Sequence, residues 1–117
     1  MSHITVKPSY KTVEVKLSGE VVASSTNALE LHEGNYPAVY YLPPEDVNRD
    51  LLRQTDQQTT CPWKGEAAYW SVEIDGKKAE NAVWAYPTPK EDVKEIEGYM
   101  AFYPNKLEVS VDGERLG

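Results

Sequence analysis

The sequence predicts a mainly β, antiparallel domain, and three observations lead to this prediction. Short segments alternate apolar and polar residues, as strands with one buried face do. Two dipeptides, Ser18-Gly19 and Asp75-Gly76, are typical two-residue hairpin turns between such segments. Only residues 44–52 and 88–98 have a helical composition, and both segments are short. We therefore expect two antiparallel sheets with one or two helical turns. The 117 residues fit a single domain spanning residues 1–117.

The first half of the chain supplies most of the strand signals. In residues 12–17 (TVEVKL), Val13, Val15 and Leu17 share one face. The Ser18-Gly19 turn leads into residues 20–23 (EVVA), and residues 28–31 (ALEL) repeat the alternation. Residues 37–42 (PAVYYL) form a continuous apolar run, which indicates a strand buried on both faces. The second half adds strands at residues 67–74, 79–86, 99–103 and 107–111.

The Asp75-Gly76 turn predicts a register for the hairpin around it. A two-residue loop pairs Trp70 with Asn81 and places Trp70 on the core face with Val72 and Ile74. The opposite face then carries Tyr69, Glu80, Trp84 and Tyr86. Large aromatic groups beside a few polar ones are typical of a small-molecule site, although a second core between two sheets uses the same residue types. Trp70 joins this site only if a bulge interrupts the hairpin.

Composition excludes several classes of partner. The net charge of −7 disfavours a nucleic-acid groove and an anionic membrane surface. The N-terminal residues contain no long apolar run, so we expect neither a signal peptide nor a membrane span. The single cysteine, Cys61, cannot form an internal disulfide, which favours a reducing, cytoplasmic location. The expected partner is an unidentified small molecule, and the sequence does not predict an oligomeric state.

Candidate chemistry centres on Cys61 in the segment CPWKG, residues 61–65. A structural zinc site needs four ligands, and Cys61, His3 and His32 are too few and unpaired. A reactive thiolate needs a nearby cation, which Lys64 offers, but also a base that the local sequence lacks. A cysteine beside a proline is more often a small packed side chain. No metal or cofactor is therefore expected.

Carboxylates offer two further possibilities. Asp46 and Asp50 lie four residues apart, but no glycine-rich phosphate loop accompanies them, so nucleotidyl transfer is disfavoured. Glu80 lies between apolar strand residues and is the best candidate for a general acid or base. Its alternative role is that of an ordinary polar residue at a sheet edge.

The motifs YPAVYYLPPEDV, CPWKGEAAYWSV, AENAVWAY and GYMAFYPNKLEV, in this order, resemble the domain of unknown function DUF427. This family has also carried a nucleotidyltransferase-like label, and the resemblance runs from about Val13 to Val111. Pro44 stands where the family usually has arginine, and histidines often found before Cys61 are replaced by Gln57, Gln58 or Thr60. The resemblance implies a β-tent: two antiparallel sheets joined at one edge and open at the other, with a groove between them.

These observations predict a small-molecule-binding β-tent module with an aromatic groove. The alternatives are an enzyme that uses Cys61 or Glu80, and a protein-interaction module without a pocket. Lys64 is a candidate gate or counter-charge at the groove. The expected ligand-binding residues are Lys64, Tyr69, Trp70, Glu80, Trp84 and Tyr86.

Overall fold

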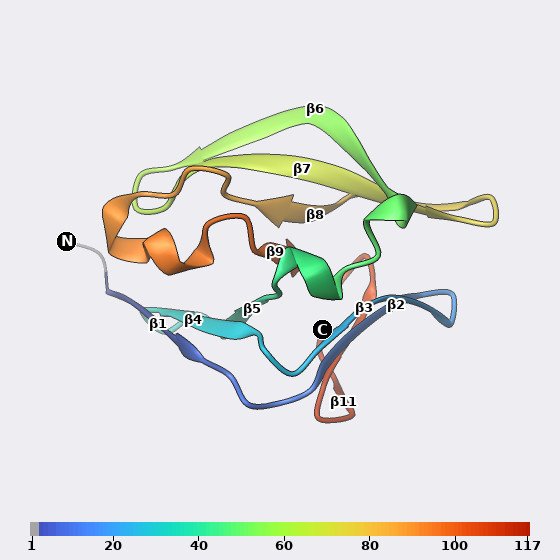
Figure 1. The fold of residues 1–117 in the computed structure, drawn as a ribbon, viewed down its shortest axis with the longest axis horizontal. Helices are drawn as coiled ribbons and strands as arrows, with labels where there is room; N and C mark the ends of the chain where they lie inside the picture. Colours follow the sequence, from blue (N-terminus) through green and yellow to red (C-terminus); the bar gives the residue numbers. More distant parts are fainter. Residues whose placement is uncertain (1–2) are drawn as a thin grey trace.

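Three antiparallel sheets make up the part of the protein that the computed structural model describes, residues 3–117 (Figure 1). Their strand orders are β1-β4-β5, β11-β10-β2-β3 and β6-β7-β8-β9. The strands are β1 Ile4–Pro8, β2 Val13–Leu17, β3 Glu20–Ser25, β4 Leu29–Glu33, β5 Val39–Tyr41, β6 Leu52–Cys61, β7 Gly65–Ile74, β8 Lys77–Ala85, β9 Met100–Phe102, β10 Glu108–Val111 and β11 Glu114–Arg115. Three short 3-10 helices lie within the expected helical segments: η1 Pro44–Asp46, η2 Arg49–Leu51 and η3 Glu91–Ile96.

The mainly β, antiparallel prediction is confirmed, but the number of sheets is three rather than two. The strand pair β1/β4 is separated from the strand pair β2/β3 by two short segments without strand structure, one between β1 and β2 and the other between β3 and β4. There, Ser9 N–H donates to Ala28 O at 2.8 Å, and the Ser25 hydroxyl accepts from Asn27 N–H at 2.9 Å. The first of these bonds joins the backbones of the two segments, whereas the second is a local serine turn of the kind that competes with ladder bonds. The interruption divides what the alternating pattern alone presents as one sheet.

The sheets β1-β4-β5 and β6-β7-β8-β9 meet edge to edge. Leu42, directly after β5, and Met100 of β9 exchange two backbone hydrogen bonds, each 2.8 Å long. In Figure 1, β6, β7 and β8 form an upper layer, and β1, β4 and β2 lie in a lower layer. The seam between Leu42 and Met100 therefore holds one edge of the upper layer against the lower one.

Two groups of buried side chains fill the space between the layers. The larger group joins β2, β3 and β10 to β7 and β8 and includes Val13, Val15, Val22 and Val72. The smaller group, which we call the aromatic cluster, contains Leu31, Tyr41, Ala67, Tyr69, Tyr86, Val93, Ile96 and Ala101, with Cys61, Trp84, Tyr99 and Tyr103 among the half-buried side chains packed against it. The aromatic cluster thus lies where β4 and β5 face β7, β8 and η3.

The β7–β8 hairpin turns at Asp75-Gly76 as expected, with both residues at positive φ. Ile74 pairs with Lys77 and Val72 with Ala79, but Trp70 pairs with Val83 rather than with Asn81. Our predicted register is therefore wrong beyond Val72, because a bulge adds residues on β8. Asn81, at φ 49°, lies in this bulge, and its N–H donates to the Ser71 hydroxyl at 3.0 Å. Because the shift is two residues, it keeps side chains on their original faces.

Strand β6 was not predicted from the sequence. Its ten residues, LRQTDQQTTC, are mostly polar and exposed, so no alternation marks them as a strand. It pairs with β7 in two stretches, from Leu52 to Gln54 and from Gln58 to Cys61.

Within residues 3–117, no helix has the length and apolar character needed to span a bilayer.

Candidate functional site

A cavity of about 470 Å³ lies within the aromatic cluster and extends toward β2 and β10. This volume falls within the range of small-molecule sites. Leu31, Val39 and Tyr41 supply the wall from β4 and β5, and Tyr69 and Trp84 supply the wall from β7 and β8. The remaining lining residues are Val13, Glu33, Tyr36, Pro37, Ala38, Tyr40, Lys64, Tyr86, Phe102, Tyr103, Pro104, Val109 and Leu116.

Two tyrosine rings pack against Trp84. The ring of Tyr103 lies against the indole, with centroids 4.4 Å apart and planes tilted by 39°. Tyr41 meets the indole edge-on at 6.2 Å, and the indole Nε1–H donates to the Tyr41 hydroxyl at 3.3 Å. Edge-on and offset ring pairs are the geometries that aromatic quadrupoles favour. Trp84 is therefore held in one orientation at the cavity wall by contacts with both sheets.

The tyrosine hydroxyls around the cavity stay protonated well above neutral pH. Burial raises the pKa of Tyr41 and of Tyr86 far above the ordinary value of 10.0. Burial, followed by the neighbouring Tyr69 hydroxyl, also raises the pKa of Tyr103 to about 12. Since a buried phenolate is disfavoured in a medium of low polarity, these three groups are neutral hydroxyls that can both donate and accept a hydrogen bond.

The hydroxyls differ in their partners. The Tyr69 hydroxyl shares a 2.8 Å hydrogen bond with Thr59 Oγ1, and the Tyr41 hydroxyl accepts from Trp84. The Tyr86 hydroxyl has no hydrogen-bond partner among residues 3–117, although the residue is only 5% exposed. Every fully buried polar side-chain atom in that same range has a partner, so the Tyr86 hydroxyl must be open to solvent. Tyr86 is also one of the residues that line the cavity.

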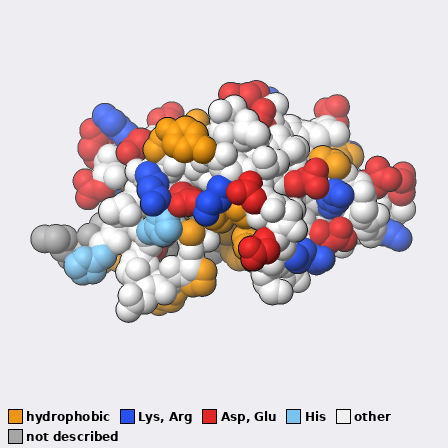
Figure 2. Space-filling model, turned by 90° about the horizontal axis from the view of Figure 1, so that it is seen from below, with side chains coloured by type: hydrophobic (Ala, Val, Ile, Leu, Met, Phe, Trp, Pro, Cys, Tyr) orange, Lys and Arg blue, Asp and Glu red, His pale blue; other side chains and the backbone are white. Residues whose placement is uncertain are grey.

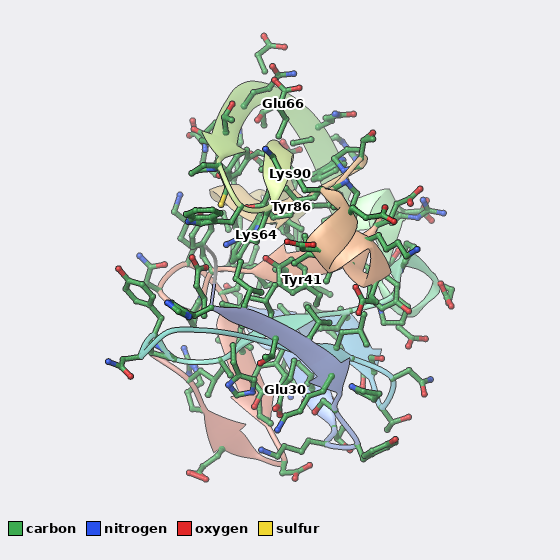
Figure 3. The ribbon with its side chains drawn as sticks, turned by 90° about the vertical axis from the view of Figure 1, so that its left-hand side faces the viewer. Glu30, Tyr41, Lys64, Glu66, Tyr86 and Lys90 are labelled. Atoms are coloured by element: carbon green, nitrogen blue, oxygen red, sulfur yellow. The ribbon has the colours of Figure 1, made fainter. Side chains whose placement is uncertain are left out.

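An ion pair spans the cavity border between the two layers. Lys64 Nζ donates to Glu33 Oε1 at 2.8 Å, and the two side chains are 12% and 29% exposed. Glu33 ends β4, whereas Lys64 lies in the turn between β6 and β7. In Figure 3, Tyr86, Lys64 and Tyr41 lie one below the other between the upper and lower ribbons. The pair therefore connects strand ends that belong to different sheets.

The turn that carries Lys64 is fixed by backbone contacts. Lys64 N–H donates to Cys61 O at 3.3 Å, and Lys64 O accepts from Lys90 N–H at 2.9 Å. Gly65 follows at φ 115°, and a Cβ there would lie 3.3 Å from Thr88 O. A residue with a side chain is strained at such a φ, so the glycine allows β7 to begin close to the segment after β8.

Four of the predicted site residues line the cavity: Lys64, Tyr69, Trp84 and Tyr86. Trp70 does not, since its half-buried side chain packs against the larger core group, and the bulge does not turn it toward the cavity. Glu80 also lies elsewhere. It is exposed in the bulged part of β8, where its carbonyl accepts from Lys106 Nζ at 2.8 Å. The sequence-based register had placed Glu80 beside Trp84 because it contained no bulge.

Cys61 is half-buried against the aromatic cluster. Its thiol takes part in no hydrogen bond recorded for residues 3–117, and it is not among the lining residues of the cavity. The structure thus places no base against the thiol in that range.

The sequence analysis missed several lining residues, chiefly Tyr41, Tyr103 and Glu33. Tyr41 belongs to the apolar run PAVYYL, whose alternation is hidden because every residue is apolar or aromatic. Tyr103 follows β9 in a segment predicted only as a strand. No local signal links Glu33 to Lys64, since only the packing of two sheets brings them together.

A second group of charged side chains lies on the other face of the β1-β4-β5 sheet. Glu30 is only 7% exposed and pairs with Tyr40 across the ladder. His32 Nε2 lies 2.9 Å from Glu30 Oε2, and Lys11 Nζ and Lys7 Nζ lie 3.6 and 4.0 Å from the carboxylate. The hydrogen bond with His32 is the main reason that the pKa of Glu30 is lowered; burial opposes it and Lys11 adds to it.

Acidic and basic side chains are interspersed with a histidine on the face shown in Figure 2. Figure 3 shows Glu30 below the lower ribbon, on the side away from Tyr41. This charged group is therefore separate from the cavity.

Of the two carboxylates that suggested phosphate chemistry, that of Asp46 has a structural contact. The Ser25 hydroxyl donates to Asp46 Oδ2 at 2.6 Å, and Asp50 lies exposed in η2, where its N–H donates to Asn48 Oδ1. No group of three or more His, Cys, Asp or Glu side chains within residues 3–117 is placed to hold a metal ion.

Comparison with known families agrees with the resemblance seen in the motifs. A comparison with curated proteins gives no match. The family model of the domain of unknown function DUF427 matches residues 5–113, which is most of the chain. The protein therefore belongs to the DUF427 family.

Proposed function

We propose that this protein is a small-molecule-binding module of β-tent type, whose ligand occupies the aromatic cavity between the sheets. In this proposal, the seam between Leu42 and Met100 is the closed edge of the tent. The Lys64–Glu33 ion pair lies at the border through which the ligand enters. The single observation that carries the proposal is that Tyr41, Tyr69, Trp84 and Tyr86, from two sheets, line one cavity of about 470 Å³.

The composition of the cavity wall supports binding of an apolar, ring-containing molecule. Among its lining residues, only Glu33 and Lys64 carry charge, and they are paired with each other. The other lining groups are aliphatic or aromatic, with phenol hydroxyls as the main polar atoms. Such walls bind by burying apolar surface and orient the ligand through a few hydrogen bonds.

The two alternatives from the sequence have less support. An enzyme that uses Glu80 needs this carboxylate at the cavity, and Glu80 is exposed outside it. Cys61 packs against the aromatic cluster without a hydrogen-bonded base in the described range. An interaction module without a pocket has less support because the structure contains a cavity of about 470 Å³, and the exposed Tyr36 is one of its lining residues.

Tryptophan fluorescence tests the proposal. Wild-type protein is titrated with a panel of planar aromatic fragments, in parallel with Trp84→Phe and Trp63→Phe variants. Trp63 is 42% exposed and is not a cavity residue, so its replacement serves as the matched control. We expect a saturable change in emission in the wild type and in Trp63→Phe, and its loss in Trp84→Phe. Absence of a saturable change for every fragment, or an unchanged response in Trp84→Phe, contradicts the proposal.

A further inference from the structure

We infer that the cavity selects a neutral, planar, conjugated carbonyl compound, whose carbonyl oxygen accepts a hydrogen bond from the Tyr86 hydroxyl. This inference rests on the proposed function and adds the chemical class of the ligand. It follows from three properties of the cavity: its unpartnered phenol O–H donors, its charge balance and the orientation of its rings.

The cavity wall carries two phenol O–H groups whose donor has no partner among residues 3–117. The Tyr86 hydroxyl has no partner among residues 3–117, and that of Tyr41 accepts from Trp84 without donating to any group in that range. By contrast, the Trp84 N–H and the Tyr69 hydroxyl already have partners within the protein. Burial keeps the Tyr41 and Tyr86 phenols protonated, so both remain donors at neutral pH. A ligand that satisfies them must present an acceptor oxygen.

The charge balance favours a neutral ligand over an ion. Lys64 and Glu33 are the only charged lining residues, and their 2.8 Å contact neutralises them mutually. A carboxylate or ammonium ligand would therefore leave one charge without a counter-charge in a mostly apolar cavity, at a cost in desolvation. The aromatic faces alone would favour a cation, but the phenol donors would then have no acceptor. A carbonyl group satisfies the donors without adding charge.

The orientation of the rings favours a flat molecule. Trp84 is fixed by Tyr103 at 4.4 Å and by Tyr41 at 6.2 Å, so its indole presents a rigid planar surface. Flat rings lose little conformational entropy when they bind against such a surface, and offset stacking adds to the buried area. A volume of about 470 Å³ accommodates a bicyclic aromatic ring with a small substituent.

Four naphthalenes of nearly equal shape test the inference: methyl naphthyl ketone, isopropenylnaphthalene, naphthoate and naphthyltrimethylammonium. Their dissociation constants are measured by ligand-observed NMR titration against wild type, Tyr86→Phe and Tyr10→Phe. Tyr10 is 89% exposed and lies outside the cavity, so its replacement removes a phenol hydroxyl without touching the site. We expect the ketone to bind the wild type about 3- to 10-fold more tightly than the hydrocarbon, as one neutral hydrogen bond allows.

Tyr86→Phe should abolish this preference and leave the hydrocarbon's affinity unchanged, whereas Tyr10→Phe should behave as wild type. If the hydrocarbon binds as tightly as the ketone, or if either ion binds most tightly, the inference about the carbonyl is wrong and the cavity remains a binding site. If Tyr86→Phe retains the preference, Tyr86 is not the donor and the inference is likewise wrong. If none of the four binds, the proposed function itself is wrong.

Discussion

The two buried phenols of the cavity make a matched pair for testing the hydrogen-bond assignments. Tyr41→Phe removes the acceptor of the Trp84 Nε1–H, whereas Tyr86→Phe removes a hydroxyl with no partner among residues 3–117. Both residues are largely buried, at 1% and 5% exposure, and both substitutions delete a single oxygen atom. A difference between the two variants therefore reports on the hydrogen bond rather than on burial.

The magnitude follows from the geometry. A neutral intramolecular hydrogen bond contributes about 0.5–1.5 kcal/mol to the free energy of unfolding. The Trp84–Tyr41 bond, at 3.3 Å, is longer than the usual optimum of about 2.9–3.0 Å, which places it in the lower half of this range. Since Trp84 is half-buried, water in the cavity replaces part of the lost contact. We expect Tyr41→Phe to lower the free energy of unfolding by about 0.7 kcal/mol, and Tyr86→Phe to change it by less than about 0.3 kcal/mol.

Urea unfolding followed by far-ultraviolet circular dichroism measures both values. With an m-value of about 1.5 kcal/mol per molar urea, a loss of about 0.7 kcal/mol lowers the midpoint by about 0.5 M. The m-value should not change, because neither substitution alters the surface exposed on unfolding. A double-mutant cycle with Trp84→Phe then isolates the coupling between the two side chains. Equal destabilisation by Tyr41→Phe and Tyr86→Phe, or zero coupling in the cycle, would refute the assignment.

Three further predictions concern charged and reactive groups. Lys64→Met should lower the free energy of unfolding by about 1 kcal/mol in urea titrations, because it leaves the Glu33 carboxylate without its partner. Adding Glu33→Gln removes this unpaired charge and should recover part of the loss. If it recovers nothing, the two residues act independently. Glu30→Gln should lower stability by less than about 1 kcal/mol near pH 7. The folded-state pKa of Glu30 lies below its ordinary value of 4.5, so its contribution is complete above that value and disappears as pH falls through the folded-state pKa. Urea midpoints of variant and wild type should therefore converge on acidification below pH 4.5, and a constant gap would contradict this. Iodoacetamide should label Cys61 slowly in the native protein and rapidly in urea, as followed by mass spectrometry, and equally fast labelling in both states would show that the thiol is not packed.

The sequence predicts the local features of this fold better than its long-range ones. Alternating segments and the Asp75-Gly76 turn identify strands because side-chain direction and turn geometry are local properties. Strand β6 escapes prediction because its polar residues are held by pairing with β7 and not by a buried face. The bulge on β8 is equally hidden, since a non-glycine residue, Asn81, adopts the positive φ that it requires.

In the candidate site, too, the sequence predicts the local features better than the long-range ones. Tyr69, Trp84 and Tyr86 can be grouped from one hairpin, because alternation within paired strands places them on one face. Tyr41 and Glu33 come from another sheet, and their approach depends on the seam between Leu42 and Met100. Glu80 was expected at the cavity because the register was extended from the turn, and a register derived from a turn holds only as far as the ladder stays regular.

The seam between Leu42 and Met100 also determines when the cavity can exist during folding. Its walls come from residues as distant in the chain as Val13 and Leu116, and the two layers meet only after β9 has been synthesised and has docked beside β5. The unfolded chain contains no equivalent of this cavity. Any molecule that occupies it must therefore bind the folded state alone and increase the folded population by mass action. In a cell, such a ligand would protect the newly made protein from degradation as well as occupy its site.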